Sequence, residues 1–165
     1  MTRICFVRHG ETDWNIELRM QGHVDIPLNA TGLAQAAALG RCFADGVDAA
    51  AIYSSDLLRA RQTAQPIAES LGLQIVPLVE LRERSFGRCE GLVIAEILER
   101  FPEEGLAMKR RDADHVPQGG ESRRQHQERI RACVRELAGR HAAQSLVVVT
   151  HGGVLDVVYR IATGL

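Results

Sequence analysis

The chain has 165 residues, of which 45% are hydrophobic and 25% are charged, and its formal net charge is −1. This composition is that of an ordinary globular protein, and the length predicts a single domain spanning residues 1–165. The balance of 20 basic and 21 acidic residues argues against a general nucleic-acid-binding protein, which would carry a basic excess.

The cysteines and the apolar runs indicate the cellular compartment. The four cysteines are scattered without a C-x-x-C pair, which favours a reducing compartment over a disulfide framework and gives no zinc-binding spacing. The first apolar run, Ile4–Val7, is shorter than a signal-peptide core, and no run approaches the roughly 18 residues of a membrane span. We therefore expect a cytoplasmic protein with no membrane partner. The oligomeric state is left open.

Short apolar runs typical of buried strands alternate with stretches of helical spacing. In chain order, the expected elements are a strand at Ile4–Val7, a helix with Leu33, Ala36, Ala37, Gly40 and Phe43 on one face, a strand at Ala50–Tyr53, a helix with Leu57, Ala60, Ala64, Ile67, Ala68 and Leu71 on one face, a weaker strand at Gln74–Pro77, a helix with Ile130, Val134 and Leu137 on one face, and a strand at Leu146–Val149. This alternation indicates an α/β fold with a largely parallel sheet.

Two features mark the region before the last strand. Ser122 and Gln125 have the spacing of a capping box, which predicts that the helix carrying Ile130 begins near Ser122. Pro102–Gly120 shows no clear pattern, and we interpret it as a surface excursion or a lid over a site.

Basic and histidine side chains follow three of the expected strands. Arg8 and His9 come directly after the first, Arg59 lies shortly after the second, and His151 follows the last, before Gly152-Gly153. Because ligands bind at the carboxyl ends of a parallel α/β sheet, these side chains are expected to converge. Arginine binds phosphate oxygens, neutral imidazole is a nucleophile, and glycines let backbone N–H groups approach an anion. The constellation therefore suits a phosphate group.

Several motifs in order along the chain resemble the histidine phosphatase superfamily, in its phosphoglycerate-mutase-like branch. The motifs are Arg8-His9-Gly10-Glu11-Thr12 with Trp14-Asn15, Gly22-x-x-Asp25-x-Pro27-Leu28-Asn29-x-x-Gly32, Tyr53-Ser54-Ser55-Asp56-Leu57-x-Arg59-Ala60-x-Gln62-Thr63-Ala64, Leu81-Arg82-Glu83-x-x-Phe86-Gly87-x-x-Glu90-Gly91, Gly120-Glu121-Ser122 and Val149-Thr150-His151-Gly152-Gly153. The resemblance implies a three-layer α/β/α fold with a central, mostly parallel sheet.

The resemblance also implies a mechanism, phosphoryl transfer through a phosphohistidine, with no metal and no cofactor. His9 would be the nucleophile, and Glu83 would protonate the leaving oxygen and then deprotonate the attacking water. The implied clamp on the phosphate is Arg8, Arg59 and His151, and the further substrate-binding residues are Asn15, Gln21, Gly22 and Gly152. The expected partner is a small phosphorylated metabolite, which could be a sugar phosphate, a phosphoglycerate, a nucleotide or a cofactor precursor.

The sequence departs from the family pattern in two places. Cys89 stands where many family phosphatases have tryptophan, which leaves that part of the pocket wall undefined. Leu165 comes soon after the expected start of the helix following His151, so the domain is expected to lack the C-terminal strand and helix of the family.

Alternatives remain at the level of residues. Glu80 is a second candidate for the acid, and Arg110-Arg111 is either a solvated charge cluster or a contact to substrate. His126 is expected to be half-buried with its hydrogen bonds satisfied. His23 and His115 are expected in loops, His23 near the phosphate, and His141 is expected at a helix end.

Alternatives also remain at the level of function. The main one is a cofactor-dependent phosphoglycerate mutase, which would share the same core residues and use the Arg110-Arg111 pair to hold a carboxylate. A metallophosphatase would draw on Asp13, Asp25 and Asp56, whose spacing matches no ligand motif. A non-catalytic phosphate-binding module would use the arginines but would have no need of His9 or Glu83.

Overall fold

In the computed structural model, which describes residues 1–46 and 48–164, parallel strands form one four-stranded sheet. The strands are β1 (Arg3–Arg8), β2 (Ala51–Ser55), β3 (Ile75–Leu78) and β4 (Ser145–Thr150), and their order in the sheet is β1-β4-β2-β3. Each strand lies within one or two residues of its predicted bounds. The predicted α/β class with a parallel sheet is confirmed.

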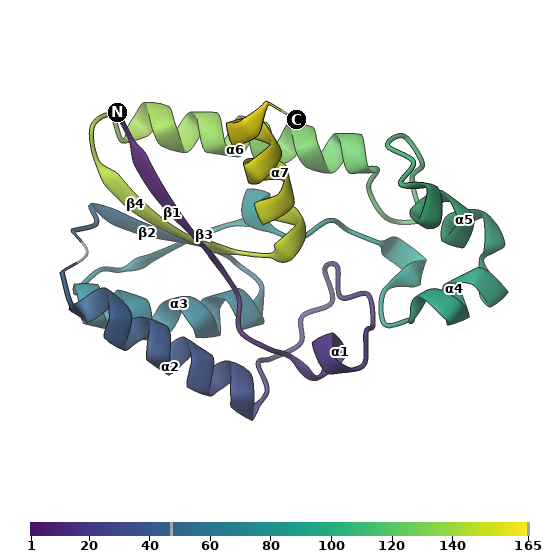
Figure 1. Cartoon of the computed structure of the whole chain (residues 1–165), viewed down its shortest axis with the longest axis horizontal. Helices are drawn as coiled ribbons and strands as arrows, with labels where there is room; N and C mark the ends of the chain where they lie inside the picture. The colour runs from purple at the N-terminus through teal and green to yellow at the C-terminus, as the bar shows by residue number, and fades with distance from the viewer. Residues whose placement is uncertain (47, 165) are drawn as a thin grey trace.

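The helices cover both faces of this sheet (Figure 1). They are α1 (Asp13–Ile16), α2 (Ala30–Ala44), α3 (Leu58–Leu71), α4 (Ile94–Arg100), α5 (Pro102–Arg110), α6 (Arg123–Arg140) and α7 (Gly152–Thr163), with short 3-10 turns at η1 (Val79–Leu81) and η2 (Gly87–Cys89). Helices α2 and α3 lie on one face and α6 and α7 on the other, whereas α4 and α5 lie beyond the carboxyl ends of the strands (Figure 1).

The core forms two layers because side chains alternate along each strand. In β4, Val147 and Val149 pack toward α3, in a cluster that includes Ile67. Leu146 and Val148 point the other way, into a cluster with residues of α6. The capping box predicted for α6 is present, since Ser122 accepts a hydrogen bond from Gln125 N and the side chain of Gln125 accepts one from Ser122 N.

The buried face of α2 differs from the predicted one. Gly40 packs so closely on α3 that a Cβ there would lie 2.8 Å from the carbonyl oxygen of Pro66. The buried residues of α2 are Gly32, Ala36, Gly40 and Phe43, whereas Leu33 and Ala37 are exposed. The prediction was therefore right for Ala36, Gly40 and Phe43 and wrong for Leu33 and Ala37, because α2 contacts α3 along the row that contains Gly40.

Residues 102–120 contain more regular structure than the sequence pattern indicated. The first half forms α5, with Pro102 in its first turn, where a missing N–H costs nothing, and with Arg111 closing it in a left-handed conformation (φ 54°). Gly105 lets α5 approach α4, because a Cβ there would lie 2.7 Å from a methyl group of Leu98. The remaining residues form turns that lead to α6.

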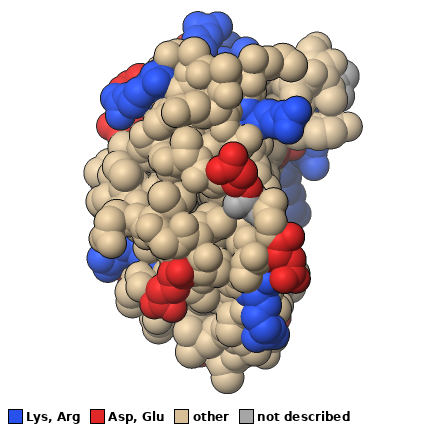
Figure 2. Space-filling model, turned by 90° about the vertical axis from the view of Figure 1, so that its left-hand side faces the viewer, with Lys and Arg blue, Asp and Glu red and all other residues tan. Residues whose placement is uncertain are grey.

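The face at which the strands begin carries basic and acidic residues interspersed among neutral ones (Figure 2). Within residues 1–46 and 48–164, no helix is both long and apolar enough to cross a membrane. The register of the sheet places the opposite strand ends together, since Arg8 pairs with Thr150 and Ser54 with Val149. The residues that follow β1, β2 and β4 therefore meet at one edge.

Candidate active site

His9 follows β1 and is buried, with 9% of its surface exposed. Its Nδ1 lies 2.7 Å from the carbonyl oxygen of Gly10, and because a carbonyl only accepts, Nδ1 carries the proton. The lone pair of the neutral ring is then on Nε2. Burial lowers the pKa of His9 to about 4, so the ring is neutral near pH 7. Gly10 N donates to Thr63 Oγ1 at 3.0 Å, which ties this loop to α3.

His151 is fully buried beside His9, and the two ring centroids are 5.1 Å apart. Its Nε2 lies 2.8 Å from Ser55 Oγ, at the end of β2. Its Nδ1 is buried and has no hydrogen-bond partner in the described part of the chain. Burial holds the pKa of His151 well below its usual value. One nitrogen of this ring is therefore anchored and the other is unpartnered, while His151 itself is not among the residues that line the cavities at this edge.

Arg59 lies in the first turn of α3 and is fully buried. It donates to the carbonyl oxygens of Gly22 at 2.8 Å and Val24 at 2.9 Å, while its Nε has no partner among the described residues. Burial lowers the pKa of this guanidinium to about 10, which leaves it charged at neutral pH. A guanidinium has five N–H donors, so Arg59 holds the loop after α1 and keeps donors for an anion.

A cavity of about 250 Å³ opens above His9. Its lining residues are Arg8, His9, Asn15, Arg19, Met20, Gln21, Gly22, Arg59, Glu83, Phe86, Gly152 and Gly153. Asn15 is oriented by its Oδ1, which accepts from Thr12 N at 3.0 Å. The Oε1 of Gln21 is buried without a partner in the described residues. Gly152 begins α7, whose N-terminus adds backbone donors and a positive dipole end.

Glu83 follows the turn at Val79–Leu81 and lines this cavity together with His9. Its two carboxylate oxygens accept from Arg84 N and from Gly153 N, each at 2.8 Å. A Cβ at position 153 would lie 2.1 Å from Glu83 Oε1, so the close approach of the carboxylate requires glycine there. Glu80, the second candidate for the acid, is exposed and lines neither cavity at this edge.

Glu90 organises the loops around the cavity, a role that the sequence analysis did not assign. Its Oε1 accepts from His23 N at 3.0 Å and Phe86 N at 2.9 Å, and its Oε2 accepts from Val24 N at 3.1 Å. The carboxylate therefore joins the loop after α1 to the segment after Glu83. The Nε2 of His23 lies 2.8 Å from the carbonyl oxygen of Glu83, which places His23 in a loop, as expected, beside the candidate acid.

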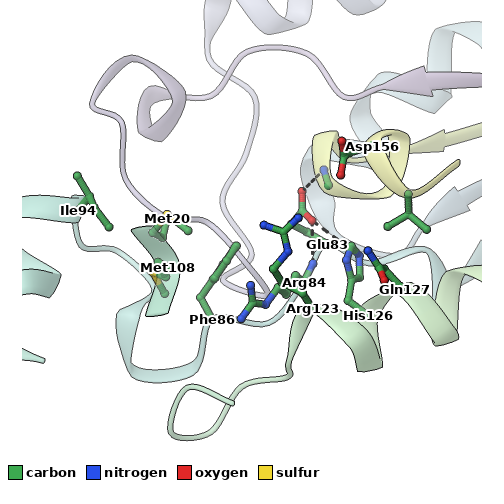
Figure 3. A pocket seen from close by; sticks show the side chains of 12 residues that line it. Met20, Glu83, Arg84, Phe86, Ile94, Met108, Arg123, His126, Gln127 and Asp156 are labelled. Carbon is green, nitrogen blue, oxygen red and sulfur yellow. Dashed lines mark hydrogen bonds and ion pairs between the residues drawn. The ribbon is translucent and has the colours of Figure 1, made fainter. Parts of the chain in front are cut away.

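A second cavity of about 300 Å³ adjoins the first and is seen in Figure 3. Met20, Glu83, Phe86 and Gly153 line both cavities. His126 of α6 lines the second one and is 4% exposed, and its Nε2 has no hydrogen-bond partner among the described residues. The expectation of a satisfied, half-buried histidine was therefore wrong. Helical spacing placed His126 on the buried face but could not show what that face meets.

Other candidates lie away from these cavities. Arg110 and Arg111 are exposed at the end of α5, and Cys89 is buried, and none of the three lines either cavity. His141 closes α6, as expected, and its Nε2 lies 2.8 Å from Tyr53 Oη. His115 lies in a loop.

Two of the three aspartates considered for a metal site have other partners. Asp56 forms an ion pair with Arg82, and Asp25 Oδ1 accepts from Leu58 N at 2.6 Å. Over residues 1–46 and 48–164, no group of three or more His, Cys, Asp and Glu side chains has an arrangement that could hold a metal ion.

Comparison with known proteins gives consistent relatives. The sequence is 40% identical over 159 residues to phosphoglycerate mutase-like protein 4 of Arabidopsis thaliana, covering 94% of this chain and 69% of that protein. It is 38% identical over 161 residues to a metal-independent phosphoserine phosphatase of the same plant, covering 96% of this chain and 68% of the relative. A mycobacterial glucosyl-3-phosphoglycerate phosphatase structure superimposes with a TM-score of 0.84 at 35% identity, covering 97% of this chain and 78% of the other.

The family model of the histidine phosphatase superfamily (branch 1) matches residues 4–165. This match spans the strand ends that carry His9 and His151 and the segment that carries Glu83. Together with the fold and the relatives, it shows that the chain belongs to the histidine phosphatase superfamily.

Proposed function

We propose that the chain hydrolyses small phosphomonoesters through a phosphohistidine at His9. The observation that carries this proposal is the fixed tautomer of His9, whose Nδ1–H donates to Gly10 and leaves Nε2 unprotonated at the floor of a cationic cavity. Phosphatases among the relatives, one of them metal-independent by name, support the same reaction class.

In the first step, Nε2 of His9 attacks phosphorus while the bond from phosphorus to the ester oxygen breaks. Glu83, in its protonated form, gives its proton to that oxygen, and the alcohol leaves. Arg8 and Arg59 lie where their N–H groups can bind the non-bridging oxygens, and the unpartnered Nδ1 of His151 is a third candidate donor. Fixed donors of this kind stabilise the charge of the transition state.

In the second step, a water molecule attacks the phosphohistidine and the bond from phosphorus to Nε2 breaks. The Glu83 carboxylate, left ionised by the first step, takes the proton of the water. Inorganic phosphate leaves, His9 returns to its neutral form, and Glu83 is again protonated. Glu83 therefore gives up one proton in the first step and regains one in the second. The cycle requires neither a metal nor an organic cofactor.

Hydrolysis is favoured over mutase activity by the position of the arginine pair. A mutase would use Arg110-Arg111 to hold the carboxylate of its substrate, but these side chains are exposed at the end of α5 and line neither cavity. Mutase activity remains the second candidate, because one relative is named phosphoglycerate mutase-like and another is named a 2,3-bisphosphoglycerate-dependent phosphoglycerate mutase.

A rapid-quench experiment tests the proposal. The protein is mixed with a ³²P-labelled phosphomonoester in EDTA, and the acid-labile, base-stable adduct is mapped by mass spectrometry. We expect the adduct on His9, phosphate release unaffected by EDTA, and no turnover by His9→Ala. An adduct on another residue, or activity that requires added zinc or magnesium after chelation, would contradict the proposal.

We further propose that the protein works in the cytoplasm. In the described part of the chain, all four cysteines are free thiols, with Cys89 and Cys133 buried, as suits a reducing compartment. Fractionation of the native host with an antibody to the protein tests this location.

A further inference from the structure

The second cavity has a polar end and an apolar end (Figure 3). Arg84, Arg123 and His126 lie at the polar end, whereas Met20 and Met108 lie at the other. Glu83 and Phe86 line this cavity and also the one above His9. A phosphomonoester whose phosphorus lies at His9 and whose leaving oxygen lies at Glu83 would therefore extend its leaving group into this second space.

The two arginines of the polar end lack acidic partners. Neither Arg84 nor Arg123 forms an ion pair with a carboxylate of residues 1–46 and 48–164. Arg84 is 9% exposed, and its Nε donates to the carbonyl oxygen of Glu121 at 2.9 Å. Burial lowers the pKa of Arg84, and the nearby charge of Arg123 lowers it further. Two neighbouring guanidinium groups of this kind favour an anion between them.

The acidic groups of the same cavity are already engaged. Glu83 accepts from two backbone N–H groups, and Asp156 pairs with Arg160 at 2.9 Å. His126 adds a nitrogen that is buried and without a partner among the described residues, and its Nε2 lies 3.9 Å from Glu83 Oε1. Buried polar atoms are normally hydrogen-bonded, so an unpartnered nitrogen in the wall of a cavity indicates a position for a ligand atom.

Resting on the proposed function, we propose that Arg84, Arg123 and His126 bind a carboxylate on the leaving group of the substrate, while Met20, Phe86 and Met108 contact an apolar part of it. The substrate class is a phosphomonoester of a hydroxy acid with an apolar body. A carboxylate fits better than a second phosphate, because Glu83 and Asp156 line the same cavity and would repel a dianion more strongly.

The test compares two esters that differ only in the group that the polar end would bind. They are 4-carboxybenzyl phosphate and 4-carbamoylbenzyl phosphate, which have similar leaving alcohols and similar size but differ in charge. We expect the wild-type protein to prefer the carboxylate by at least about tenfold in kcat/KM, the lower end of what a hydrogen bond between charged groups contributes. The free alcohols, tested as competitive inhibitors, should show the same preference.

Variants locate the preference within the cavity. Arg123→Gln and His126→Leu should each lower the ratio between the two esters several-fold, mainly through KM of the carboxylate ester, and Arg84→Gln should do the same if it folds. Arg110→Gln is the matched control, because this exposed arginine lines neither cavity, and it should leave the ratio unchanged. Thermal unfolding verifies that each variant is folded.

The outcomes separate this inference from the function on which it rests. Equal kcat/KM for the two esters, with normal phosphohistidine formation at His9, would overturn the carboxylate subsite and leave the phosphatase intact. A preference for the carboxylate ester that persists in Arg123→Gln and His126→Leu would show that other residues bind the carboxylate, and would overturn the proposed subsite. Preference for a bisphosphate ester over the carboxylate ester would show that the substrate class is wrong. Failure of every ester to phosphorylate His9 would instead refute the proposed function.

Discussion

The Nδ1 nitrogen of His9 donates a hydrogen bond to the carbonyl oxygen of Gly10 at 2.7 Å. This bond fixes the ring orientation and leaves only Nε2 able to attack phosphorus. The loop that supplies the carbonyl is held in turn by Thr63 of α3, which accepts from Gly10 N and donates to the carbonyl oxygen of Arg59. The nucleophile and the buried arginine of the site are therefore positioned through one threonine.

The first prediction concerns the titration of His9. Burial lowers its pKa from 6.5 to about 4, so in the free protein Nε2 should keep its lone pair from neutral pH down to about pH 5 and lose it below about pH 4. The nucleophile is thus removed as the pH falls through 4, not through 6.5. NMR of ¹³C-labelled histidine, with His9→Gln used to assign the signal, measures this midpoint. A midpoint at or above 6.5 would show that His9 is solvated.

The second prediction separates the two arginines of the clamp. The side chain of Arg8 is exposed and makes no hydrogen bond with the described residues, so Arg8→Ala should lower kcat by about 10²–10³ with an unchanged melting temperature. Arg59 also holds the carbonyls of Gly22 and Val24, so Arg59→Ala should lose at least as much activity and roughly 2–4 kcal/mol of stability.

The neighbouring Arg61 provides the control for these variants, because it lies on the exposed side of α3. Arg61→Ala should change neither kcat nor the free energy of unfolding, measured by urea titration. If Arg59→Ala proved as stable as Arg61→Ala, the loop-holding role of Arg59 would be refuted.

Local patterns sufficed to predict the strands, the start of α6 and the positions of His9 and His151. A strand of buried valines and a capping box are encoded within a few residues. Because ligands bind at the carboxyl ends of parallel strands, the predicted strand positions also predict where the site lies. The unpredicted features depend on residues distant in sequence. His126 lies near Glu83 only because α6 packs beside α7. Leu33 is exposed because α2 packs on α3 through a different row of residues, the one that contains Gly40.

The third prediction concerns Glu83 as the general acid. Glu83→Gln can still accept the hydrogen bond from Gly153 N but cannot release a proton, so phosphorylation should slow by about 10²–10⁴ with alkyl phosphates. An aryl phosphate with a good leaving group needs less protonation and should lose much less in this step. Burst kinetics with the two classes of ester measure the difference. Equal losses would remove Glu83 from the role of acid.

A glycine substitution tests the same carboxylate without altering it. Gly153→Ala places a Cβ 2.1 Å from the present position of Glu83 Oε1 and must displace the carboxylate. It should therefore reproduce the leaving-group dependence of Glu83→Gln. Gly139→Ala, at a helical position with no atom within 4 Å of the added Cβ, is the control and should retain full activity.

The last prediction decides between hydrolysis and isomerisation, which share His9, Glu83 and the cationic clamp. A mutase must shield the phosphohistidine from water and retain a bisphosphorylated intermediate while it reorients, which favours a longer cover with extra basic residues over the site. Here α5 contributes Met108 to the cavity wall, while Arg110 and Arg111 are exposed and line neither cavity. Water should therefore reach the intermediate.

With 3-phosphoglycerate as substrate and 2,3-bisphosphoglycerate as primer, we expect free phosphate to form faster than 2-phosphoglycerate, as followed by ³¹P NMR. Replacing both Arg110 and Arg111 by alanine should leave this partition unchanged. Isomerisation faster than phosphate release, and its loss in the double variant, would show that the pair does cover the site and that the protein is a mutase.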